Sequence, residues 1–142
     1  MEIADVRNRL TQTIERSRRE AAARRTRNDE AARAFETFLD RSAVPLFKQI
    51  ANVLKIENYS FTVFTPSGSV RWMSDRNADD YIEVSLDTSG GAKPRVIGHV
   101  RNSRGRRVVD AERVIGEGEP ESLTEEDLLA FMLKELEPFV ER

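Results

Sequence analysis

The chain of 142 residues contains no cysteine and a single histidine, His99. The absence of cysteine excludes disulfides, thiolate zinc sites, iron–sulfur clusters and cysteine nucleophiles. One histidine also excludes a histidine-rich metal site. We therefore expect no metal and no other cofactor. A cysteine-free chain is also consistent with a cytoplasmic protein.

Long apolar runs are absent as well. The apolar runs span only a few residues, whereas a helix that crosses a bilayer needs about 20. The opening residues MEIADVRNRL have an acid at position 2 and no continuous apolar segment, unlike a secretory signal. Charged residues make up 34% of the chain, yet the net charge is only −2. These features predict a soluble protein that has no membrane partner and does not bind through total charge alone.

Motifs that mark an enzyme are missing too. There is no Gly-x-Ser-x-Gly elbow, no P-loop ending in lysine and a hydroxyl residue, and no dinucleotide fingerprint. His99 falls in the middle of a predicted strand, where a satisfied or solvent-facing histidine is far more common than a general base. We expect a non-enzymatic protein without catalytic residues.

Residues 2–56 have the apolar periodicity of a helix, with spacings of three, four and seven. In the middle of this stretch, at positions 17, 21, 24 and 28, the same face carries no large apolar residue. Thr26 as an N-cap and Pro45 as a helix breaker predict two or three helical pieces. The periodic positions are Ile3, Val6, Leu10, Ile14, Ala32, Phe35, Leu39, Leu46, Ile50 and Val53.

From Tyr59 the period changes to two, which is typical of strands. Five predicted strands follow one another with short turns and no helix between them, so they should form an antiparallel meander. In the third strand, Ile82, Val84 and Leu86 should face the core. The predicted strands are 59–65, 69–74, 80–88, 95–101 and 107–115.

Residues 117–127 contain six acids and no base. We interpret this acidic span as a solvated linker leading into the helix 123–142, although it could also engage a basic partner. Thr124 is the predicted N-cap, and the acids after it complement the helix dipole. The prediction is one α+β domain over 1–142: an N-terminal helical arm (1–57), an antiparallel sheet of about five strands (58–116), and an acidic linker with a C-terminal helix packed on the sheet (117–142).

The first helix carries a narrow apolar seam made of Ile3, Val6, Leu10 and Ile14. A seam this narrow is typical of a contact between two helices, as in a coiled coil. The stretch without a large apolar residue on this face, around positions 17–28, separates the seam from the sheet-forming part of the chain. We therefore expect the seam to pack on a second copy. The leading hypothesis is a homodimeric binding or adaptor protein with an unknown protein partner.

Arginine outnumbers lysine nineteen to four, which leaves nucleic-acid binding as the alternative function. One arginine cluster lies on the first helix and the other in the predicted turn between the last two strands. Arg104-Gly105-Arg106 resembles the core of an AT-hook, which implies a minor-groove contact, but the flanking prolines are absent. We favour a solvated helix face for the first cluster and a hairpin tip with a positive φ at Gly105 for the second, since neither needs a ligand. The candidate contacts are Arg16, Arg18, Arg19, Arg24, Arg25, Arg27, Arg101, Arg104, Arg106 and Arg107.

Overall fold

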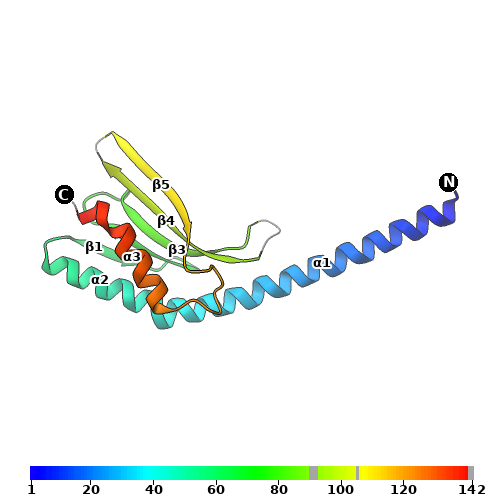
Figure 1. Ribbon diagram of the computed structural model, residues 1–142, viewed down its shortest axis with the longest axis horizontal. Helices are drawn as coiled ribbons and strands as arrows, with labels where there is room; N and C mark the ends of the chain where they lie inside the picture. Colours follow the sequence, from blue (N-terminus) through cyan, green and yellow to red (C-terminus); the bar gives the residue numbers. More distant parts are fainter. Residues whose placement is uncertain (90–92, 105, 141–142) are drawn as a thin grey trace.

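The computed structural model describes residues 1–89, 93–104 and 106–140. It confirms the α+β class, with a long N-terminal helix, a five-stranded antiparallel sheet and a C-terminal helix (Figure 1). The elements are α1 (Ile3–Phe38), η1 (Leu39–Ala43), α2 (Val44–Ile56), β1 (Phe61–Phe64), β2 (Ser69–Ser74), β3 (Tyr81–Asp87), β4 (Arg95–Arg104), β5 (Arg107–Val114) and α3 (Glu125–Val140). None of the helices within these ranges is both long and apolar enough to cross a membrane.

The prediction of a break at Thr26 is wrong, because α1 runs without interruption for 36 residues. The Thr26 hydroxyl donates a hydrogen bond to the Ala22 carbonyl, one turn back in the same helix, at 3.1 Å. The chain contains no glycine or proline before Pro45, and alanine, arginine and glutamate are strong helix formers. Good intrinsic propensity therefore carries the helix through the segment that lacks an apolar face.

The second predicted break, at Pro45, is a π-helical turn and not an end of the helix. Pro45 has no N–H, so the α-helical hydrogen bond to the carbonyl of Arg41 is unavailable. The structure places one wide turn, η1, just before the proline, and the Val44 N–H donates to the Leu39 carbonyl five residues back. A π turn of this kind inserts an extra residue without unfolding the helix. The chain stays helical from Ile3 to Ile56.

The sheet is the predicted meander, with strand order β1-β2-β3-β4-β5 and every pair antiparallel. The first strand is shorter than predicted and begins at Phe61. The fourth is longer, because β4 continues to Arg104, which pairs with Arg107 at the start of β5. As expected, Ile82 and Val84 point into the core, and Leu86 packs against it.

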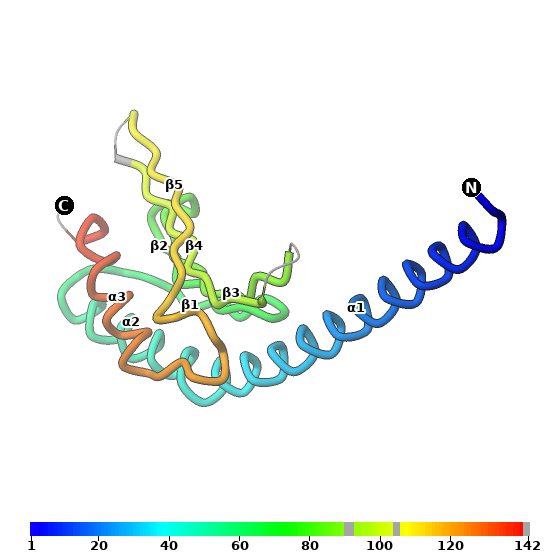
Figure 2. The backbone as a smooth tube through the Cα atoms, turned by 45° about the vertical axis from the view of Figure 1, so that its right-hand side comes forward, coloured from blue at the N-terminus to red at the C-terminus, as the bar shows by residue number. Residues whose placement is uncertain are grey.

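The core lies between one face of the sheet and the helices. The end of α1, η1, α2 and α3 all lie on that face, and Figures 1 and 2 show no described element over the other face. Phe35 and Phe47 from the first helical layer and Met132 from α3 meet Val70 and Val84 of the sheet in a single apolar cluster. The result is a two-layer α+β domain with one open sheet face.

Two aromatic contacts position α3. Phe61 stacks on the fully buried Trp72, with ring centroids 3.7 Å apart, and Phe139 of α3 meets Trp72 edge-on at 5.4 Å. Further along, the Phe131 ring lies over Gly98 of β4, where a Cβ atom would come within 2.2 Å of Phe131 Cζ. The absence of a side chain at Gly98 is what allows α3 to approach the sheet this closely.

The start of α3 confirms the predicted cap. The Asp127 N–H donates to the Thr124 hydroxyl, and the Thr124 N–H donates to the Asp127 carboxylate, both at 3.1 Å. This reciprocal pair is a capping box with aspartate in the third position. Pro138 lies inside the helix, which continues to Val140.

Candidate functional site

The arm, which we define as residues 3–28 of α1, extends away from the rest of the molecule (Figures 1 and 2). Residues 1–20 are all exposed, and the first buried residue of the helix is Ala31. At about 1.5 Å per residue, the arm reaches on the order of 40 Å. It is the longest part of the described chain that has no buried residue.

The structure places the four seam residues together on this arm. They follow one another at spacings of three, four and four, so they lie along one face of the helix. The exposed fractions are 79% for Ile3, 40% for Val6, 57% for Leu10 and 49% for Ile14. A row of large apolar side chains in water is energetically unfavourable.

The six candidate arginines of the arm are exposed along the same helix, namely Arg16, Arg18, Arg19, Arg24, Arg25 and Arg27. The second cluster lies at the tip of the β4–β5 hairpin, which points away from the arm in both views (Figures 1 and 2). Arg106 and Arg107 are exposed there. The side chain of Arg104 and the expected positive φ at Gly105 lie outside the described part of the chain. The fold therefore does not join the two clusters into one basic surface.

Arg101 is not at the hairpin tip with the others. It lies on the open face of the sheet, half-buried, with its guanidinium 3.7 Å from the Asp110 carboxylate. The same carboxylate also forms a hydrogen bond with the His99 ring. Because its charge already has a partner within the chain, Arg101 is a poor candidate for a phosphate contact.

Across the open face, polar side chains of neighbouring strands form a connected network. The Arg71 guanidinium donates to the Glu83 carboxylate at 3.3 Å and lies over the Tyr81 ring, 4.1 Å from its centroid. The other neighbour of Tyr81 is His99, which meets it edge-on at 5.4 Å. The arginines of β2 and β4 on this face thus lie beside carboxylates of neighbouring strands.

On the same face, where β3 ends and β4 begins, Arg95 lies 3.8 Å from Asp87. Hydrogen bonds from the side chain and the backbone N–H of Ser89 lower the pKa of Asp87, and Arg95 contributes less. Sequence alternation correctly assigns Tyr81, Glu83 and Asp87 to this face. It cannot reveal their partners, because the register between strands decides which side chains meet.

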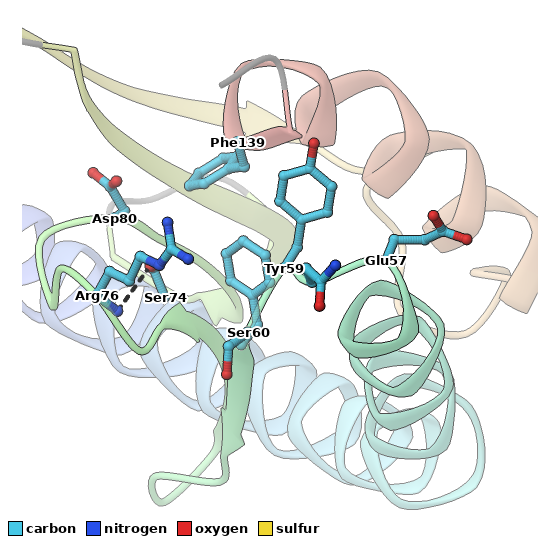
Figure 3. Close-up of a pocket in the computed structure, with 9 residues that line it drawn as sticks. Glu57, Tyr59, Ser60, Ser74, Arg76, Asp80 and Phe139 are labelled. Carbon is cyan, nitrogen blue, oxygen red and sulfur yellow. Dashed lines mark hydrogen bonds between the residues drawn. The ribbon is translucent and has the colours of Figure 1, made fainter.

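A cavity of about 270 Å³ lies between the end of α2, the start of β1, the β2–β3 loop and the end of α3 (Figure 3). Two of its polar groups hydrogen-bond within the fold. The Tyr59 hydroxyl donates to the Val140 carbonyl at 2.9 Å, and the buried Asp80 accepts hydrogen bonds from the N–H and hydroxyl of Ser103 at 2.8 and 2.9 Å. Within the described part of the chain, no three or more histidine, aspartate or glutamate side chains gather around a metal position.

No family model, curated protein or solved structure matches this chain.

Proposed function

We propose that the protein is a non-enzymatic, homodimeric protein-binding or adaptor protein, and that the seam on the arm is its dimer contact. The observation that carries the proposal is the exposure of Ile3, Val6, Leu10 and Ile14 on one face of a helix that nothing else in the chain covers within the described residues. Association through such a seam stabilises the helix and removes apolar surface from water. The proposed location is the cytoplasm, as the cysteine-free composition favours.

The charges on the arm favour an antiparallel pair of arms. Residues 16–27 hold six arginines and one glutamate, and a parallel pair would lay two such basic spans side by side, where like charges repel. In an antiparallel pair that overlaps over residues 3–14, the two spans leave the contact in opposite directions. Ile3 of one arm then faces Ile14 of the second arm, and Val6 faces Leu10.

Sedimentation velocity tests the dimer. The wild-type chain should sediment with the mass of two chains, and an Ile3→Asp, Leu10→Asp variant with the mass of one. An Arg9→Asp, Glu15→Arg variant, which changes exposed polar positions of the same helix, should remain dimeric. Circular dichroism reports whether each variant retains its folded domain. A wild-type monomer, or a folded seam variant of unaltered mass, refutes the seam as the dimer contact.

The absence of native cysteine allows the orientation to be read by cross-linking. In an antiparallel pair the two Ile3 positions lie about 16 Å apart, which is too far for a disulfide. We therefore expect oxidation to link a mixture of Ile3→Cys and Ile14→Cys chains, but neither variant alone. Efficient linking of each variant to itself would show that the arms run parallel.

A further inference from the structure

The last strand of the sheet has a free edge. β5 lies at the end of the strand order and pairs with β4 alone among the described residues. The Ile115 N–H donates to the Val96 carbonyl at 3.0 Å. Because N–H groups alternate in direction along an antiparallel strand, those of Val108, Asp110, Glu112 and Val114 point away from β4. β5 therefore presents a row of outward backbone groups eight residues long.

A groove of about 210 Å³ runs beside this edge, between the core-side face of β5 and α3. Val100, Val109, Ala111 and Pro138 supply its apolar lining. At one end of the groove, the Arg113 guanidinium forms an ion pair with Glu135 of α3 at 2.6 Å. Val109 is 49% exposed, and Val108 on the opposite side of the strand is 57% exposed. An added strand would direct every second side chain into this groove.

A second copy of β5 is a poor occupant of its own edge. When two copies pair antiparallel about the middle of the strand, Asp110 faces either Asp110 or Glu112 of the other copy. Like charges directly opposite each other destabilise a strand pair. The edge thus disfavours self-association and favours a partner with the opposite charge.

We propose that β5 and the groove between β5 and α3 bind an extended peptide in which basic and apolar side chains alternate, added to the sheet as a sixth strand. Its basic side chains would lie beside Asp110 and Glu112 on the open face of the sheet, and its apolar side chains would enter the groove over Val109 and Ala111. Asp110 already pairs with Arg101 and hydrogen-bonds to His99, so the exposed Glu112 carries most of the charge selection. This inference names the partner class of the proposed binding protein and rests on that proposal.

Fluorescence anisotropy with the full chain and two labelled hexapeptides tests the site. The peptide Lys-Val-Lys-Val-Lys-Val should bind, and Glu-Val-Glu-Val-Glu-Val should not. A Glu112→Lys variant should weaken binding of the basic peptide about fivefold and gain binding of the acidic one, since a cross-strand attraction becomes a repulsion. Glu117→Lys, the same charge change in the linker, should leave both affinities unaltered.

A second variant separates strand addition from simple charge attraction. Val108→Pro removes one outward N–H and no hydrogen bond of the β4–β5 ladder, so the domain should still fold. Its affinity for the basic peptide should fall about fivefold or more. The inference is overturned if neither Glu112→Lys nor Val108→Pro changes the affinity for the basic peptide. It is also overturned if the wild-type chain does not bind this peptide. If wild type still sediments as a dimer in that case, the proposed dimer stands and only the peptide site is lost.

Discussion

Single residues decide how closely the layers of this domain approach each other. Gly98 is the clearest case, because the Phe131 ring occupies the space where a Cβ atom would lie. Trp72 is the second, since its fully buried indole joins β2 to Phe61 of β1 and to Phe139 of α3. Neither role belongs to the proposed binding surfaces. Both hold the sheet and α3 in the relative position that creates the groove beside β5.

Gly98→Ala tests this close approach. The new methyl group would overlap Phe131, so the free energy of unfolding measured in urea should fall by about 2 kcal/mol. In a Phe131→Leu background, which removes these ring atoms, the same glycine substitution should lower the free energy of unfolding by clearly less. Equal losses in the two backgrounds would show that Phe131 is not the obstacle.

Elements at the margin of the fold depend on a few polar contacts. β1 is only four residues long and lies at the edge of the sheet opposite β5. Asp75, just after β2, accepts hydrogen bonds from the hydroxyls of Ser60 and Thr62, and its own N–H donates to the Ser60 carbonyl at 3.1 Å. The hydroxyl contacts, Ser60 first and then Thr62, lower the pKa of Asp75. They bind the short strand to the following loop.

The lowered pKa of Asp75 makes this contact sensitive to acid. A carboxyl whose pKa is lower in the folded state stabilises the fold above its unfolded pKa of about 3.9, and this contribution is lost as the pH falls through the folded pKa. We expect Asp75→Asn to flatten the decline in unfolding free energy between about pH 6 and about pH 2. Asp79→Asn, at an exposed position of the same loop, should leave the decline as it is in wild type. Identical acid profiles for wild type and Asp75→Asn would refute the assignment.

At the scale of the whole molecule, the arm and the β4–β5 hairpin point in different directions from a shared two-layer domain (Figure 1). The dimer contact and the peptide edge that we propose are therefore separate surfaces. The same separation divides the two arginine clusters. This weakens the nucleic-acid alternative, which gains most from a single continuous basic surface.

Charge reversal on the arm distinguishes the two functions. If the arm arginines are merely solvated, Arg18→Glu, Arg25→Glu chains and wild type should be retained equally by labelled duplex DNA as the salt concentration rises. A phosphate-binding arm would instead lose affinity on reversal, and its salt dependence would become shallower by about one unit of slope per lost contact. That outcome would support the nucleic-acid function over the adaptor.

The sequence alone determined the element types and their order. Alternation in 80–88, the Thr124 cap and the short turns between strands are local signals, and local signals are sufficient to define a meander in which each strand pairs with the next. The seam residues also follow from spacing alone, as does the absence of large apolar residues from the middle of the same helix face. The continuous α1 differs from the predicted break, because a stretch free of glycine and proline stays helical through the cap-like residue Thr26.

Only the tertiary structure decided which residues meet across the fold. Strand register brings Arg71, Glu83 and Asp110 into the network on the open face. Residues 11 or more apart in the chain carry no mutual signal in a single sequence. The π turn before Pro45 and the contact between Gly98 and Phe131 likewise depend on how the layers pack. The groove beside β5 appears only once α3 is placed, because a surface between two elements is not a property of either element alone.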